Sequence, residues 1–338
     1  MPQPISKFKV RSPSNIAFVK YWGKYGRQYP MNPSLSMTLS HCYTEYNFEY
    51  HFDTKAPGIH SFLFDGMANE NFKRRLDKFL ENCSDVYPLA KSLVLKLESK
   101  NTFPHSAGIA SSASAMSAFC LGLGHIESLY KNEKLDLKRA SFLSRLASGS
   151  ACRSLFPSFS LWGETKMGLG HNDYAIAYEN FHPSFASLQD AVIIVSAQEK
   201  SVSSSAGHQL MNAHCFKEAR IDQAHENLRT LIGAMESGDM EAFGEIIEQE
   251  ALTLHALMMT STPSYLLLAP NSLEVIQRVR SFRKETGLPV YFTIDAGPNI
   301  HLIYPLEVKE HVDKFLTSLD DICENIIYDE IGQGAEVL

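Results

Sequence analysis

Residues 101–117 read N-T-F-P-H-S-A-G-I-A-S-S-A-S-A-M-S, and this stretch predicts a loop that enters a helix. It begins extended, because the residue before a proline is pushed out of the α region. From Ala110 to Ala115 every side chain is small, and an apolar pattern follows. The first N–H groups of such a helix lack intrahelical acceptors and lie at its positive end. The stretch therefore predicts either a phosphate site or a slim helix packed against a sheet.

The composition of the chain bounds what it can be. Its 338 residues are 44% hydrophobic and 20% charged, which is ordinary for two globular domains or one bilobal one. A net charge of −7 argues against a non-specific nucleic-acid surface. The six cysteines form no C-x-x-C pair, which is typical of a reducing compartment. No signal peptide or membrane-spanning run is evident, so we expect a cytoplasmic protein that binds neither nucleic acid nor membrane.

Strand and helix patterns are interspersed without a strict βαβα rhythm, so we expect the α+β class. Residues 8–23, 35–39 and 43–52 each predict a strand. Residues 88–98 predict a helix, and residues 206–238 predict one long helix.

A domain boundary is expected in the middle of the chain. Residues 190–196 read D-A-V-I-I-V-S, a short β-branched run typical of a buried strand. We place the boundary just before it, which gives domains 1–189 and 190–338.

Two lysines flank the end of the first predicted strand, in the string K-Y-W-G-K at residues 20–24. Lys20 and Lys24 beside a glycine predict either a site for anionic oxygens or solubilising charges at a strand terminus. No G-x-x-x-x-G-K-[ST] string occurs in the chain, so a bound nucleotide would use another kind of phosphate loop.

A second polar string, S-G-S-A-C-R-S, occupies residues 148–154. Its serines can donate hydrogen bonds, and Arg153 offers a planar fork to a carboxylate or phosphate. The alternative is a helix start capped by Ser148 or Ser150, with Arg153 on the surface. We expect Cys152 to be a packing residue, because no His/Asn context supports a nucleophile.

A third string, T-I-D-A-G-P-N at residues 293–299, places Asp295 at the end of a predicted buried strand. A carboxylate held on a rigid strand end suits general-base catalysis. An Asx-type turn residue is the alternative.

Taken in order, these strings resemble the mevalonate diphosphate decarboxylase family of the GHMP kinase superfamily. The likeness runs from S-N-I-A-F-V-K-Y-W-G-K at residues 14–24 to I-G-Q-G-A at residues 331–335. K-Y-W-G-K, S-G-S-A-C-R-S and D-A-G-P-N are specific to the decarboxylase branch, whereas G-I-A-S-S-A-S is general to the superfamily. The resemblance implies the GHMP kinase fold, with an N-terminal ribosomal-S5-like α/β lobe, a C-terminal ferredoxin-like α+β lobe and a cleft between them.

The resemblance also implies a reaction: ATP- and Mg²⁺-dependent decarboxylation of mevalonate 5-diphosphate to isopentenyl diphosphate. Asp295 matches the catalytic aspartate near the C3 hydroxyl, Arg153 the arginine that positions the substrate carboxylate, and Lys20 a further catalytic residue. The substrate-binding positions it implies are Tyr21, Lys24, Ser148, Gly149, Ser150, Arg153, Ser204 and Ser205. The ATP-binding positions it implies are Ser106, Gly108, Ala110, Ser111, Ser112 and Ser114. It assigns no metal ligand.

Two positions depart from the family pattern. Phe156–Trp162 replace a Gly-Gly and an acidic residue of many members, and His208 stands where many have Met. Both concern the phosphorylated tail of the substrate, so mevalonate monophosphate stays an alternative substrate. A mevalonate-type kinase without decarboxylation is one competing function, and the presence of both Arg153 and Asp295 disfavours it. A non-enzymatic ligand-binding relative is another, and the complete set of polar site residues disfavours it. A homodimer is a family expectation.

Overall fold

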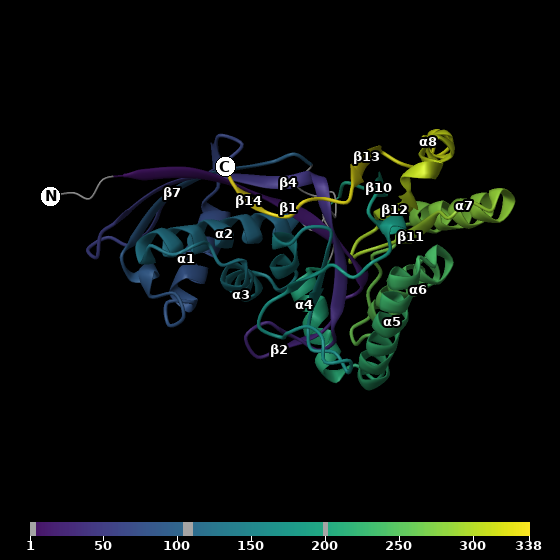
Figure 1. Cartoon of the computed structure of the whole chain (residues 1–338), viewed down its shortest axis with the longest axis horizontal. Helices are drawn as coiled ribbons and strands as arrows, with labels where there is room; N and C mark the ends of the chain where they lie inside the picture. Colours follow the sequence, from purple (N-terminus) through teal and green to yellow (C-terminus); the bar gives the residue numbers. More distant parts are fainter. Residues whose placement is uncertain (1–4, 104–110, 199–201) are drawn as a thin grey trace.

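The structure is a computed structural model that describes residues 5–103, 111–198 and 202–338. Figure 1 shows two lobes: a sheet lined by helices on one side, and a smaller sheet with a group of helices at the other end of the molecule. The mixture of antiparallel strands and helices confirms the expected α+β class.

The larger sheet is organised by two long antiparallel strands, β1 (Ser6–Val19) and β4 (Ser34–Phe52). Its order is β14-β1-β4-β7-β5-β6, with β8 paired to β4 and β9 to β8. The remaining strands are β5 (Gly58–Phe64), β6 (Met67–Ala68), β7 (Leu93–Asn101), β8 (Phe159–Trp162), β9 (Ile176–Tyr178) and β14 (Glu336–Val337). A small ribbon, β2 (Lys24–Tyr25) with β3 (Tyr29–Pro30), follows β1.

Three helices belong to this lobe: α1 (Glu70–Asn82), α2 (Ser111–Lys131) and α3 (Leu137–Ala147). The central one, α2, lies very close to the sheet, because a Cβ on Gly122 would come within 2.2 Å of the Phe48 ring. The first turns of α2 also lie against the sheet, since Ser114 contacts Thr44 of β4 at 2.8 Å.

The second sheet has the order β11-β12-β10-β13 and is antiparallel throughout. Its strands are β10 (Leu188–Ile194), β11 (Tyr291–Thr293), β12 (Ile300–Pro305) and β13 (Asn325–Glu330). The helices of this lobe are α4 (Ser204–Leu210), α5 (Lys217–Ser237), α6 (Met240–Met259), α7 (Pro270–Thr286) and α8 (Lys309–Thr317). Short 3₁₀ turns lie at Pro88–Lys91, Gly149–Leu155, Pro183–Phe185, Met211–Ala213 and Leu306–Val308.

One apolar core continues from the first lobe into the second. Phe18 of β1 meets Phe243 of α6 edge-on, with ring centroids 5.0 Å apart. The same cluster holds residues of β4 and of β10, such as Leu35 and Val192. The chain then returns after β13, and β14 pairs with β1 near the C-terminus (Figure 1). The two lobes are therefore packed as one body.

Three expected elements differ from the structure. Residues 88–98 are a short turn followed by β7, not a helix, because Leu93, Leu95 and Leu97 alternate into the core while β7 pairs with β4. The two strands expected at 35–39 and 43–52 are one strand, β4. The helix expected at 206–238 is divided, since His214 is extended and its Nδ1 accepts a hydrogen bond from the N–H of Phe216.

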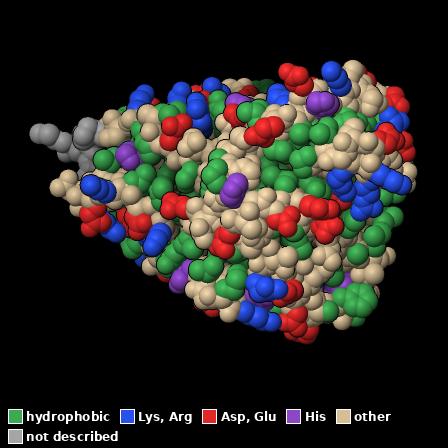
Figure 2. Space-filling view, turned by 45° about the vertical axis from the view of Figure 1, so that its right-hand side comes forward, with side chains coloured by type: hydrophobic (Ala, Val, Ile, Leu, Met, Phe, Trp, Pro, Cys, Tyr) green, Lys and Arg blue, Asp and Glu red, His purple; other side chains and the backbone are tan. Residues whose placement is uncertain are grey.

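The exterior carries charges of both signs. Figure 2 shows acidic and basic side chains interspersed on the face drawn. Among the described residues, no helix combines the length and apolar character needed to cross a bilayer.

Candidate functional site

A cavity of about 700 Å³ lies where the two lobes meet. It is bounded by the end of β1, the start of α2, the 3₁₀ turn after α3, the start of α4 and the loop after β11. The predicted site residues that line it are Lys20, Tyr21, Lys24, Ser111, Ser112, Ser148, Gly149, Ser150, Arg153, Ser204, Ser205 and Asp295.

One of the described ATP-loop positions, Ser114, does not line the cavity, and three others are not described. Ser106, Gly108 and Ala110 lie outside the described residues. Ser114 is fully buried, and its hydroxyl contacts Thr44 Oγ1 at 2.8 Å and the carbonyl of Ser111 at 3.2 Å. Its side chain is thus turned toward the sheet rather than into the cavity.

Lys20 and Asp295 form an ion pair across the two lobes. Lys20 Nζ donates to Asp295 Oδ1 at 2.8 Å; the lysine side chain is 2% exposed and the aspartate side chain 30%. Burial alone would raise the pKa of Asp295, but the Lys20 ammonium outweighs it and holds that pKa below its ordinary value. Burial lowers the pKa of Lys20, against the opposing attraction of Asp295. The interpretation of Lys20 as a solubilising charge is therefore wrong.

Arg153 is a buried cation held by neutral oxygens. Its Nε donates to Asn15 Oδ1 at 3.2 Å and to Ser36 Oγ at 3.1 Å, and its Nη1 donates to Ser34 Oγ at 2.8 Å. Within the described ranges it has no carboxylate at ion-pair distance, and burial lowers its pKa. A desolvated cation without a counter-ion favours an anion in the cavity that it lines. Arg153 is thus not the surface residue of the alternative interpretation.

Another part of the cavity wall is made of a glycine and one unsatisfied hydroxyl. A Cβ on Gly149 would lie 2.7 Å from Tyr21 Oη, so the turn and the tyrosine ring are in close contact. Tyr21 Oη is buried and has no hydrogen-bond partner in the part of the chain that is described. Burial raises the pKa of this phenol. An orphaned hydroxyl beside a cavity fits an oxygen atom of a bound ligand.

At the start of α2 the cavity has hydroxyls and an arginine that sequence reasoning missed. Arg75 of α1 donates through Nη2 to Ser112 Oγ at 2.9 Å, and Ser112 lies 3.5 Å from Ser148 Oγ. No local signal marks Arg75 among the basic residues of α1; only the packing of α1 beside α2 identifies it. The combination of a helix N-terminus, hydroxyls and a guanidinium fits the phosphates of a nucleotide.

His208 of α4 completes the wall near Lys24. Its Nδ1 accepts a hydrogen bond from the N–H of Gly23 at 3.0 Å, and its ring lies 4.3 Å from the Tyr21 ring and 4.6 Å from the Trp22 ring. Burial lowers the pKa of His208 to about 3, so the ring is neutral near pH 7 and its proton resides on Nε2. Burial also lowers the pKa of the half-buried Lys24.

A metal ion fits this site only together with phosphates. The described residues contain no group of three or more His, Cys, Asp or Glu side chains able to hold a metal. Mg²⁺ commonly keeps waters and binds through one or two carboxylates plus substrate phosphates. Asp295 supplies a carboxylate in the cavity lining, so the donor set fits magnesium delivered with a nucleotide.

The fold and site together define a class: a two-lobed α+β protein of the GHMP kinase fold, with its ligand cavity between the lobes. Residues 12–175 match the diphosphomevalonate decarboxylase-like N-terminal domain, and residues 191–335 match the mevalonate 5-diphosphate decarboxylase C-terminal domain. The chain belongs to the diphosphomevalonate decarboxylase family.

Individual relatives agree with this assignment. Diphosphomevalonate decarboxylase ERG19 of Gibberella zeae is 31% identical over 320 residues, covering 89% of this chain and 81% of its own. The Schizosaccharomyces pombe diphosphomevalonate decarboxylase is 29% identical over 329 residues, with 92% and 82% covered. The crystal structure of mevalonate diphosphate decarboxylase from Staphylococcus aureus has a TM-score of 0.86 at 29% identity, with 99% and 98% covered. A complex described as MDDEF with MVAPP, AMPPCP and magnesium has a TM-score of 0.84 at 29% identity, with 99% of each chain covered.

Proposed function

We propose that this protein catalyses the ATP-dependent decarboxylation of mevalonate 5-diphosphate, giving isopentenyl diphosphate, ADP, phosphate and CO2. Family membership supports the proposal. The observation that carries it is the meeting of three groups in one cavity: the Lys20–Asp295 pair, the uncompensated Arg153 and the start of α2.

The chemistry needs two charged groups with different tasks. A tertiary hydroxyl is a poor leaving group and its phosphate a good one. Departure of that phosphate leaves a developing cation at C3, and the substrate carboxylate can then leave as CO2 with formation of a double bond. The site must therefore activate a hydroxyl, tolerate positive charge at C3 and hold a carboxylate in line.

Asp295 suits the first two tasks. Its lowered pKa keeps it ionised near neutral pH, so it can accept or orient the hydroxyl proton and then offer negative charge to C3. Lys20 keeps the carboxylate in place at 2.8 Å. Arg153 suits the third task, because its planar fork can hold the substrate carboxylate without protonating it.

The nucleotide phosphates are assigned to the start of α2, with Ser111, Ser112 and the newly identified Arg75. When bound, Mg²⁺–ATP supplies the transferable phosphoryl group and neutralises charge on it. The phosphorylated tail of the substrate is assigned to Lys24 and to the hydroxyl-rich wall. That wall comprises Tyr21, Ser148, Ser150, Ser204 and Ser205.

One assay separates the proposed reaction from the competing functions. Purified protein is given Mg²⁺, ATP and mevalonate 5-diphosphate, and both ADP formation and CO2 release are measured. Equal release of ADP and CO2 supports the decarboxylase. ADP without CO2 indicates a kinase, and neither product indicates a non-enzymatic ligand-binding relative.

The choice between the diphosphate and the monophosphate is tested by comparing kcat/KM for the two mevalonate esters. Because His208 is a neutral donor beside Lys24, His208→Met should raise KM for the preferred ester while leaving KM for ATP unchanged. A larger kcat/KM for the monophosphate would replace the diphosphate in the proposal.

We also propose a cytoplasmic location and a homodimer. The six cysteines are free thiols, four of them buried, which supports a reducing compartment. The homodimer is an expectation from the family resemblance. Light scattering on the purified protein tests it, and a mass of one chain would contradict it.

A further inference from the structure

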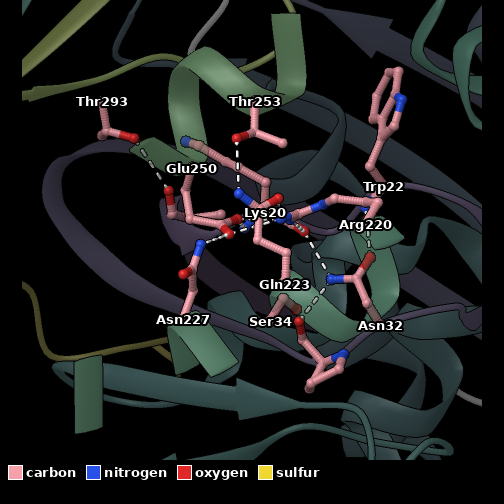
Figure 3. A network of polar contacts seen from close by, with 12 residues as sticks. Lys20, Trp22, Asn32, Ser34, Arg220, Gln223, Asn227, Glu250, Thr253 and Thr293 are labelled. Carbon is pink, nitrogen blue, oxygen red and sulfur yellow. Dashed lines mark hydrogen bonds and ion pairs between the residues drawn. The ribbon is translucent and has the colours of Figure 1, made fainter. Parts of the chain in front are cut away.

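A buried polar network surrounds the backbone of Lys20 (Figure 3). Glu250 of α6 is its centre: one oxygen accepts the N–H of Lys20 at 2.8 Å. The carboxylate also accepts both terminal nitrogens of Arg220 of α5, at 2.6 and 2.7 Å, and Asn227 Nδ2 at 2.6 Å. The Glu250 side chain is 0% exposed and that of Arg220 1%. The network is therefore closed to water and held by charge-assisted bonds.

The carbonyl group of Lys20 is held as firmly as its N–H. It accepts Arg220 Nη2 at 3.0 Å and Asn32 Nδ2 at 2.9 Å. Both polar groups of the Lys20 main chain are thus bonded to side chains. This arrangement fixes the path of the chain directly after β1, at the residue whose side chain lines the cavity.

The same helix holds the partner of Lys20. His255, five residues after Glu250 on α6, contacts the carbonyl oxygen of Asp295 through Nε2 at 3.1 Å. A carbonyl oxygen only accepts, so Nε2–H is the donor. Burial lowers the pKa of His255 to about 4, which keeps the ring neutral near pH 7. One rigid helix therefore holds the main chain of both members of the ion pair.

We propose that α6 sets the separation of Lys20 and Asp295, with Glu250 and His255 as positioning residues and Arg220 orienting Glu250. The inference rests on the proposed function for its activity readout. Neither positioning residue is given a contact with substrate; each acts through the residue whose backbone it holds. Because the reacting geometry tolerates little displacement, loss of either contact should lower turnover more than ligand affinity.

The competing explanation is that Glu250 and His255 only stabilise the fold. Both explanations predict that their substitution lowers stability. Removing one partner of a buried ion pair is destabilising wherever the pair lies. The chain offers a matched control on the same helix: Glu248, also buried, accepts Arg283 Nη1 at 2.6 Å and Nη2 at 3.2 Å. That pair ties α6 to α7, and Glu248 also accepts the N–H of Phe292 of β11 at 3.4 Å; it contacts neither Lys20 nor Asp295 among the described residues.

The charge of Glu250 gives a second readout, the pH dependence of turnover. Its negative charge favours the protonated form of Lys20, so Glu250→Gln should lower the pKa of Lys20. The alkaline limb of kcat/KM should then move to lower pH. The charged or titratable groups that face or contact Lys20 from the elements packed around it are Asp295, Glu250, Arg153, Arg220, His255 and Asp190.

The experiment compares Glu250→Gln, His255→Leu and His255→Gln with Glu248→Gln in the full-length protein. We expect Glu250→Gln and His255→Leu to lower kcat about tenfold or more, with binding of a non-hydrolysable ATP analogue within about twofold. His255→Gln keeps a donor and should recover most of the activity. Glu248→Gln should lose stability but keep the kcat and pH profile of the parent.

A crystal structure of His255→Leu supplies a readout independent of activity. We expect the Lys20 Nζ to Asp295 distance to exceed the 2.8 Å of the parent. An unchanged ion pair and unchanged kcat in His255→Leu would overturn the inference, and this variant decides the matter if Glu250→Gln does not fold. Failure of the parent to release CO2 would instead refute the proposed function; the structure of His255→Leu still tests the positioning.

Discussion

At the residue scale, the site depends on two buried cations, Arg153 and Lys20, whose charges are balanced to different degrees. Arg153 illustrates this, since three neutral oxygens hold its guanidinium and leave its charge for a ligand. Lys20 differs, because Asp295 balances its charge and Glu250 accepts a hydrogen bond from its main-chain N–H. The two cations therefore have different roles: Arg153 can bind an anionic ligand, and Lys20 holds the Asp295 carboxylate in position.

Arg153→Lys should retain weak activity, whereas Arg153→Met should lose nearly all of it. A charge-assisted bond to a carboxylate is worth about 1.5–3 kcal/mol, and lysine keeps the charge but not the fork. The affinity for ATP should change little in either variant, because Arg153 is assigned to the substrate carboxylate and the start of α2 to the nucleotide phosphates. Steady-state CO2 release and calorimetric ATP titration check this. Equal activity in all three proteins would remove Arg153 from the site.

Asp295→Asn should abolish turnover and leave nucleotide binding nearly intact. The amide cannot take the hydroxyl proton, and the buried Lys20 loses its counter-ion. The measurements are CO2 release and binding of a non-hydrolysable ATP analogue. Near-normal turnover would show that another group acts as the base.

The same pair predicts a pH dependence of stability. The folded-state pKa of Asp295 lies below its ordinary value of 3.8, so the folded protein binds this proton less tightly than the unfolded chain. The stabilisation is complete above pH 3.8 and is lost as pH falls through the folded pKa. Urea unfolding between pH 3 and 6 should show the parent losing its advantage over Asp295→Asn only at the acid end. An advantage that instead declined toward pH 6 would contradict the assignment.

At the scale of elements, the start of α2 matters because its first turn is slim. Ser112→Leu should weaken ATP binding about tenfold or more, since the side chain blocks approach to the first N–H groups. Ser112→Ala keeps the access and loses only the hydroxyl contacts with Arg75 and Ser148, so its affinity should stay much closer to that of the parent. Calorimetry with an ATP analogue checks both, with circular dichroism as the test of folding. Unchanged affinity in Ser112→Leu would place the nucleotide elsewhere.

The elements also show where local reasoning holds and where it fails. A helix beginning within the run of small residues was predictable, because glycine and apolar spacing act locally. The first strand was predicted to end near Gly23 but ends at Val19, because side chains of distant elements bond the main chain of Lys20. The segment 88–98 was predicted wrongly as a helix. Its leucines at 93, 95 and 97 satisfy the period of a strand, and pairing with β4 decides the outcome.

At the scale of the whole molecule, the lobes are joined by more than the apolar core. Asp329 of β13 accepts the N–H groups of Ser40, His41 and Cys42 of β4, at 2.7–2.9 Å. This carboxylate therefore ties the second sheet to the first. The expected domain division at 189–190 stays a proposal; β10 begins at Leu188, and the two family matches end at 175 and begin at 191.

Asp329→Asn should lower the free energy of unfolding by roughly 1.5–3 kcal/mol, because an amide cannot accept all three N–H groups. Turnover per folded molecule should stay at the parental level, since Asp329 is not among the residues that line the cavity. Asp321→Asn is the control: its ion pair with Arg278 lies at the surface, with the aspartate side chain exposed, so its loss should cost clearly less than the loss of Asp329. Denaturant unfolding of both variants measures the difference, and equal costs would deny Asp329 a role in joining the lobes.

The sequence by itself determined the chemical types available to the site and the local elements that carry most of them. The local patterns are lysines at a strand end, small residues at a helix start and an aspartate before Gly-Pro-Asn. Such patterns can be predicted because backbone preferences depend mainly on neighbouring residues. Only the tertiary structure decided which way those side chains turn and what they meet. Lys20 and Asp295 are 275 positions apart, Ser114 faces the sheet, and Arg75, His208 and Glu250 reach the site through packing of distant elements. Burial, counter-ions and side-chain direction depend on contacts that no local pattern contains, and these decide the charge and position of each group.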